Sequence, residues 1–142
     1  KKKLKNKKIP KLIPTLTLFS SDNTSDQLSF SISDQLTVVA PSVNLSTIIV
    51  DTTGANNIIV PANDNKQSWV YVKHTGTTDG STTTAQHCDV ELTGDVAVGT
   101  LKPGEFFWFP FCGNGSSKGV QLQSVSGNIQ MEYGYWSDST AQ

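Results

Sequence analysis

Apolar and polar residues alternate in short stretches along most of this chain. The segments that contain Leu28, Phe30 and Ile32, and later Cys88 and Val90, are clear examples. An alternation with a period of two places the two sets of side chains on opposite faces of a β-strand. No stretch keeps a helical period for three turns. We therefore expect strands near residues 16–19, 28–32, 36–40, 47–50, 57–60, 68–73, 88–92, 106–110, 120–122 and 129–135.

Turn-forming residues separate these segments, as in residues 53–56, 102–104 and 126–128. About nine or ten short strands with turns between them predict an all-β fold, an antiparallel β-sandwich of jelly-roll type, rather than a barrel. The length fits one such domain, which we place at residues 15–142. Residues 75–85 contain only small and polar side chains, so we expect a mobile loop that projects from the domain.

The first fourteen residues, KKKLKNKKIPKLIP, differ from the rest. Seven of the eleven lysines lie within the first eleven residues, whereas the other 131 residues hold four lysines, no arginine and all twelve acidic residues, a formal charge of −8. Pro10 and Pro14 disfavour a helix, so we expect residues 1–14 to form an extended basic arm. Its expected partner-binding residues are Lys1, Lys2, Lys3, Lys5, Lys7, Lys8, Lys11, Leu12 and Ile13.

Two interpretations of this arm are open. It is either an unstructured solubilising tail or a contact for an acidic protein surface or nucleic acid, and the apolar residues between its lysines favour a contact. Without arginine, we expect no sequence-specific reading of bases. Pro10, Lys11 and Pro14 interrupt the apolar run that a signal peptide would need, so we expect no signal peptide. The apolar runs are too short to span a membrane.

The sequence offers little for metal or redox chemistry. We expect Cys88 and Cys112 to be free thiols, with a single disulfide as the alternative. His74 and His87, together with these cysteines, lack the spacing of a zinc site. We predict no metal and no cofactor.

An enzyme is also not expected. Asp89 and Glu91 share the face of a strand opposite Cys88 and Val90, so we expect both carboxylates to face water, where nothing would shift their pKa values for acid–base catalysis. Glu105 is the remaining candidate. The chain has no nucleophile elbow and no phosphate-binding loop, so we predict no catalytic residues.

Two strands are apolar on both faces, within SWVYVK at residues 68–73 and EFFWFPF at residues 105–111. One face can meet the second sheet of a sandwich, but the other needs a cover, which a neighbouring subunit can supply. We therefore expect a subunit interface at Trp69, Tyr71, Phe107, Trp108 and Phe109. The alternative is a carbohydrate-binding platform that uses Trp69, Trp108 or Trp136.

The stretches SWVYVKHTG, LKPGEFFWFPF and IQMEYGYW resemble small virion structural proteins of tailed bacteriophages, which decorate or cement a capsid or line tail components. The similar positions are residues 71–73, 101–105 and 132–133. The resemblance implies a β-sandwich that assembles on a symmetric shell, often as a trimer, with a terminal arm that reaches neighbouring capsid subunits. It also implies a place in the virion, at the capsid surface, after synthesis in the host cytoplasm.

On this basis we expect a non-enzymatic capsid cement or decoration subunit. Its arm and its aromatic strands would bridge neighbouring subunits, with the major capsid protein or another virion protein, and further copies of itself, as partners. Two alternatives are a tail, neck or fibre-associated structural protein of the same fold, and a carbohydrate-binding β-sandwich.

Overall fold

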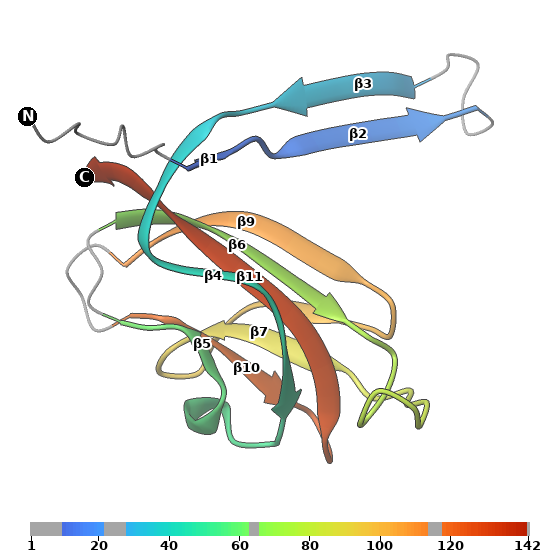
Figure 1. The fold of residues 1–142 in the computed structure, drawn as a ribbon. Coiled ribbons are helices and arrows are strands. Elements are labelled where there is room, and N and C mark those ends of the chain that lie inside the picture. Colours follow the sequence, from blue (N-terminus) through green and yellow to red (C-terminus); the bar gives the residue numbers. More distant parts are fainter. Residues whose placement is uncertain (1–9, 22–27, 63–65, 114–117, 142) are drawn as a thin grey trace, which may run out of the picture.

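A computed structural model describes residues 10–21, 28–62, 66–113 and 118–141. This part of the chain forms an all-β sandwich of two antiparallel sheets, with a separate two-stranded hairpin above one of them (Figure 1). The predicted fold class is confirmed. Residues 1–9 of the predicted basic arm lie outside the described residues.

Eleven strands are described. The first sheet has the order β1 (Lys11–Leu12), β4 (Leu36–Val50), β11 (Ile129–Ala141), β6 (Lys66–His74) and β9 (Phe106–Cys112). The second has the order β5 (Ile58–Val60), β10 (Val120–Ser124), β7 (Cys88–Leu92) and β8 (Val96–Leu101). The hairpin consists of β2 (Thr15–Ser20) and β3 (Leu28–Ser33). A short 3₁₀ turn, η1 (Gly54–Asn56), lies between β4 and β5.

The strand pairing has the nested order of a jelly roll. β4 pairs with β11, β5 with β10, β6 with β9, and β7 with β8, all antiparallel. These pairs form one long ribbon that doubles back at the turn between β7 and β8. Rolling the ribbon places β11 beside β6 and β10 beside β7, which completes two four-stranded sheets. The short β1 extends the first sheet beyond β4.

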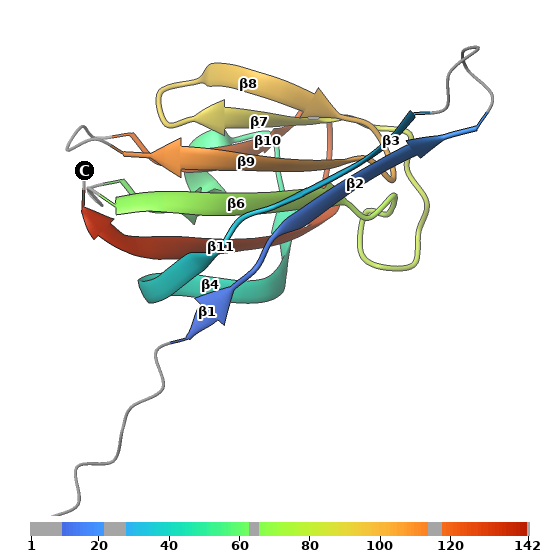
Figure 2. The ribbon, with the colours of Figure 1, turned by 90° about the horizontal axis from the view of Figure 1, so that it is seen from above.

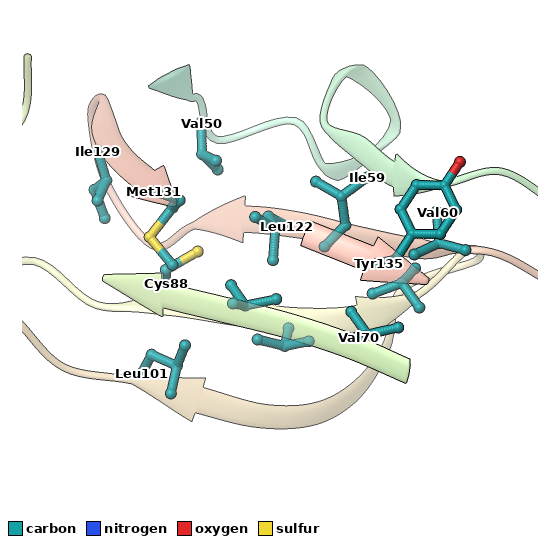
Figure 3. Packing of buried hydrophobic residues seen from close by; sticks show 13 residues of the cluster. Val50, Ile59, Val60, Val70, Cys88, Leu101, Leu122, Ile129, Met131 and Tyr135 are labelled. Carbon is teal, nitrogen blue, oxygen red and sulfur yellow. The ribbon is translucent and has the colours of Figure 1, made fainter. Parts of the chain in front are cut away.

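Side chains that alternate along the strands form the core between the two sheets. Val70 and Val72 of β6 face inward, opposite Leu122 and other side chains of the second sheet, and all three are completely buried. Cys88 and Met131 point toward one another at one end of this core (Figure 3). The period of two recognised in the sequence therefore corresponds to the inner face of each sheet.

Strand β4 differs from the expected pattern. The sequence predicted two strands, at 36–40 and 47–50, but one strand runs without interruption from Leu36 to Val50. Its middle, PSVNLS, has few large apolar residues and is mostly exposed. It stays extended because it pairs with β11 across two register shifts. Pairing with a central strand thus outweighs a weak local preference.

The segment at 75–85 forms a loop that is hydrogen-bonded to β11 where it begins. The backbone N–H of Thr75 donates to the carbonyl of Gln130 at 3.2 Å, and the N–H of Gln130 donates to the carbonyl of Thr77 at 2.8 Å. A β-bridge between Thr77 and Thr83 closes the loop. The loop thus has hydrogen-bonded structure of its own, because backbone hydrogen bonds do not require apolar side chains, and residues 79–83 at its tip are exposed.

The β2–β3 hairpin stands off the sandwich and crosses over the outer face of the first sheet (Figures 1 and 2). It is attached at its base. The backbone N–H of Asp34 donates to the carbonyl of Pro14 at 3.1 Å, and the N–H of Val38 donates to the carbonyl of Pro10 at 2.9 Å. In the described part of the chain, no helix is long and apolar enough to cross a membrane.

Candidate functional site

Five aromatic side chains emerge together on the outer face of the first sheet because of the strand register. Trp136 of β11 is opposite Trp69 of β6, and Tyr71 of β6 is opposite Trp108 of β9. Phe106 lies two residues before Trp108 and so shares its face. We call this set the aromatic face: Trp69, Tyr71, Phe106, Trp108 and Trp136.

The three indole rings of the aromatic face contact one another. The ring centroids of Trp69 and Trp108 are 5.4 Å apart with an angle of 15° between the planes, which is a stacked arrangement. Those of Trp108 and Trp136 are 5.8 Å apart and tilted by 40°. The Nε1–H of Trp136 also donates a hydrogen bond to Oδ1 of Asn44 at 3.2 Å. The rings are thus held in fixed relative positions.

Tyr71 adds a polar group to the aromatic face. Its hydroxyl donates a hydrogen bond to Oε1 of Glu132 at 3.0 Å. Burial of the phenol, together with this bond and the negative charge of Glu132, raises the pKa of Tyr71 to about 12. The phenol is therefore a neutral donor over the whole physiological pH range.

The hairpin above this sheet has one apolar face. Leu16 is opposite Ile32, and Leu18 is opposite Phe30, while Leu28 follows on the same side. We call these five residues the hairpin apolar face, and their side chains are 41–59% exposed. The opposite face carries Phe19, which is 70% exposed, and small hydroxyl residues such as Thr17 and Ser31, whose side chains share a hydrogen bond of 3.2 Å. No charged residue occurs in 15–21 or 28–33.

A cleft of about 800 Å³ separates the base of the hairpin from the aromatic face. Its floor is formed by the five residues of the aromatic face. The opposite wall has the apolar residues Leu12, Pro14, Leu16 and Ile32 and the hydroxyl residues Thr15, Thr17 and Ser33. Asp34 is the one charged residue among the described residues that line it. This arrangement suits an apolar occupant and offers little to an ionic one.

The structure separates the five residues that the sequence assigned to a subunit interface. Trp69, Tyr71 and Trp108 lie on the aromatic face. Phe107 and Phe109 point to the other side of β9, where their rings stack at 4.5 Å and pack against the core. Phe106 and Trp136, which the sequence did not assign to the predicted interface, also lie on the aromatic face. The period of two from Trp108 would have identified Phe106, whereas the place of Trp136 depends on the register of β11.

The predicted arm is described only in its last five residues. Lys1, Lys2, Lys3, Lys5, Lys7 and Lys8 lie outside the described residues. Lys11 is exposed, Leu12 lines the cleft, and the side chain of Ile13 is 62% exposed. The C-terminal end of the arm is therefore joined to the cleft, since Lys11 and Leu12 pair with Thr37 and Leu36 of β4.

One expectation about the acidic residues is wrong. Glu91 does not face water, because its side chain is only 6% exposed on the outer side of the second sheet. Its Oε2 accepts a hydrogen bond from Nε2 of Gln121 at 2.9 Å, and the same amide nitrogen donates to Oδ1 of Asp95 at 3.0 Å. The turn η1 lies against Gln121 and brings Gly54 close to both side chains. Asp89 accepts a hydrogen bond from the hydroxyl of Thr100 at 2.6 Å.

The cysteines and histidines do not form a cluster. Cys88 and Cys112 are free thiols, and burial raises the pKa of the Cys88 thiol to about 12, with a smaller contribution from the charge of Asp89. His74 is completely buried. Its Nδ1 accepts a hydrogen bond from the N–H of Gly76, and its Nε2–H donates to the carbonyl of Gln86. Among the described residues, no three His, Cys, Asp or Glu side chains are grouped so that they could hold a metal ion.

No protein-family model matches this chain, and no curated protein is detectably similar to it in sequence.

Proposed function

We propose that this protein is a non-enzymatic structural subunit of a virion shell, of the capsid cement or decoration kind that its sequence resemblance implies. The observation that supports this most is the pair of incompletely covered apolar surfaces, the aromatic face and the hairpin apolar face, on one small domain. Large exposed apolar patches are rare on monomeric proteins and mark association sites.

The incomplete packing of the hairpin is a second reason to expect association between subunits. A two-stranded hairpin is at best marginally stable in water unless it packs against other structure. Here the side chains of Leu18, Leu28 and Phe30 remain 41–51% exposed, so the packing within one chain is incomplete. Contact with another subunit would complete it. The jelly roll is also an architecture that many capsid proteins use, which is an argument from fold alone.

The basic arm gives the proposal its electrostatic part. Seven lysines precede a body with a formal charge of −8, so the arm is complementary to an acidic neighbour such as the major capsid protein, another virion protein or another copy of this chain. Such contacts weaken as salt rises, whereas apolar contacts do not. Assembly through both surfaces, with a trimer as the expected oligomer, should be only partly sensitive to salt.

The experiment that tests the proposal is the native mass of the purified chain by light scattering, at low and at high salt. A closed oligomer at both salts is expected, because the apolar surfaces are buried in it. Deletion of residues 1–9, which leaves β1 in place, should preserve this oligomer and reduce salt-sensitive binding to acidic partners. A monomer at both salts, up to the highest soluble concentration, would contradict the proposal.

A carbohydrate-binding function is the second candidate. It is favoured by the three adjacent indoles and by the nearby polar groups of Asn44 and Glu132. Against it, the face of Trp108 is partly used in stacking on Trp69. A glycan array with the native chain and with Trp108→Ala separates the two functions. Binding that the substitution abolishes, on a chain that stays monomeric, would favour carbohydrate.

A further inference from the structure

We infer that subunits exchange their β2–β3 hairpins, so that the hairpin apolar face of one copy lies on the aromatic face of a second copy. This inference rests on the proposed function and names the partner of the cleft. It goes further by specifying which surface of each copy meets which surface of the other.

The two surfaces match in chemistry. The floor of the cleft is aromatic and holds Trp69, Trp108 and Trp136, and the one charged residue that lines the cleft, among those described, is Asp34 near the base of the hairpin. An occupant must therefore present an uncharged apolar surface, because a charged group would lose its hydration there. The hairpin apolar face meets this requirement, since neither described hairpin segment, 15–21 or 28–33, contains a charge.

Within one chain, the hairpin apolar face and the aromatic face do not bury each other. Leu16 and Ile32 belong to the hairpin apolar face and line the cleft, yet they are 46% and 59% exposed. Farther along the hairpin, Leu18, Leu28 and Phe30 do not line the cleft at all. These exposed side chains therefore lie outside the chain's own cleft, and a second copy can bring the same kind of sheet to them.

The attachment of the hairpin allows such an exchange. It joins the sandwich through β1, which has only two residues paired with β4, and through the connection after β3. Pro14 lies in the first of these connections. Exchange of an identical element between two copies costs little, because the contacts made between chains replace those available within one chain.

The exposed area is of the size that a specific contact needs. The five side chains of the hairpin apolar face leave on the order of 100 Å² each to bury, and the aromatic face adds on the order of 300 Å². A copy that donates its hairpin and receives another, in a dimer or in the expected closed trimer, therefore buries about 800 Å² in all, and roughly 800 Å² per partner is typical of specific protein interfaces. A one-sided contact would bury about half as much on each copy.

The first test introduces one charge on each side of β3. Phe30→Asp places a carboxylate on the hairpin apolar face, and Ser31→Asp places the same group one residue later on the hydroxyl face. Both residues are exposed, so both variants should keep the native circular dichroism spectrum. Phe30→Asp should reduce the native mass to that of a monomer, while Ser31→Asp should leave the oligomer unchanged. Equal masses for the two variants would overturn the inference.

The second test uses disulfide formation, in chains that carry Cys112→Ser to remove the more accessible native thiol. A chain with Ile32→Cys and a differently sized tagged chain with Phe106→Cys are mixed and oxidised. Both positions line the cleft, so a bond could also form within one chain that carries both cysteines. In the mixture, we expect a disulfide that joins the Ile32→Cys chain to the Phe106→Cys chain. The chain that carries both substitutions should form a covalent dimer or a larger species.

The outcomes separate this inference from the proposed function. A disulfide that forms only within the doubly substituted chain would show that the hairpin closes on its own sheet, and the exchange would be wrong. An oligomer of native mass without any disulfide between chains would also overturn the exchange, while the proposed structural function would stand. A native chain that remains monomeric would contradict both.

Discussion

The indole ring of Trp136 lies across Gly134, two residues earlier in the same strand. A Cβ atom on Gly134 would stand 2.9 Å from Cη2 of that ring, and 3.2 Å from the carbonyl oxygen of Val43 on β4. The absence of a side chain at residue 134 therefore allows the ring to turn inward along the sheet toward Trp108, whose centroid is 5.8 Å away. The shape of the aromatic face depends on this glycine.

Gly134→Ala should lower the free energy of unfolding by about 1–3 kcal/mol, because the added methyl group forces the indole ring out of its position. Urea unfolding followed by circular dichroism measures this change. In a Trp136→Ala background the same substitution should cost clearly less, since the ring is gone. An unchanged cost in that background would assign the clash to the carbonyl of Val43 instead.

The buried His74 should make stability depend on pH. Burial lowers the pKa of His74 below its usual 6.5, although the hydrogen bond to the carbonyl of Gln86 opposes this shift. Well above pH 6.5 the ring is neutral in both the folded and the unfolded chain. As the pH falls below 6.5, the unfolded chain binds a proton that the folded chain does not, so the free energy of unfolding should decrease until the pH reaches the folded pKa.

A histidine variant isolates this effect. His74→Gln should remove the decrease in stability below pH 6.5, at a cost of about 1–3 kcal/mol at neutral pH for the disrupted hydrogen bonds of Gly76 and Gln86. The matched control is His87→Gln at an exposed position, which should retain most of the decrease, because burial lowers the pKa of His74 more than the charge of His87 does. Measurements above about pH 5 avoid the titration of carboxylates such as Asp79, whose pKa is about 2 in the folded chain. The same decrease in the His74 variant would contradict this explanation.

At the alkaline end, the phenol of Tyr71 should ionise late. Its pKa is about 12 in the folded chain, against a usual value of 10, so the unfolded chain loses this proton first and stability should decrease as the pH rises from 10 through 12. Glu132→Gln should lower the pKa of Tyr71 only in part, because burial is the larger cause. The pKa of Tyr71 is measured from the rise of tyrosinate absorbance with pH, after the same titration of the Tyr71→Phe variant has been subtracted. No change in the Glu132 variant would leave burial as the sole cause.

The core should respond very differently from the surface to the same change. Leu122 is completely buried between the sheets, so Leu122→Ala should lower the free energy of unfolding by about 2–5 kcal/mol. Leu45, whose side chain is 61% exposed on β4, is the matched control, and Leu45→Ala should change stability by less than about 0.5 kcal/mol. Equal effects in chemical unfolding would mean that Leu122 does not belong to the cooperative core.

The sequence was sufficient for the fold class because alternation identifies strands wherever one face is buried. It failed at β8, which was not among the expected strands. Val96 and Val98 of that strand are 49% and 43% exposed, so an edge strand with weak burial produced a weak pattern. It also could not give strand order, since pairing between distant segments such as β4 and β11 leaves no local signal.

The candidate site shows the same limit. The sequence identified β6 and β9 as apolar on both faces but could not say which face turns inward. The structure decides this through the register, in which Val70 and Val72 enter the core and Trp69 and Tyr71 face outward. The burial of Glu91 could not be predicted for a related reason. The turn η1, which lies against it, comes from a different part of the chain, so the pattern of β7 alone gives no sign of this contact.

The nested pairing of the jelly roll also sets the order in which the chain can fold. The innermost turn can close early, since Asp89 and Thr100, which share a hydrogen bond, are 11 residues apart. The outermost pair joins Asn44 to Trp136, which are 92 residues apart, and such long-range contacts make folding slow. Because β11 lies between β4 and β6, the first sheet stays split until this late strand leaves the ribosome, and its half-formed edges remain exposed during synthesis.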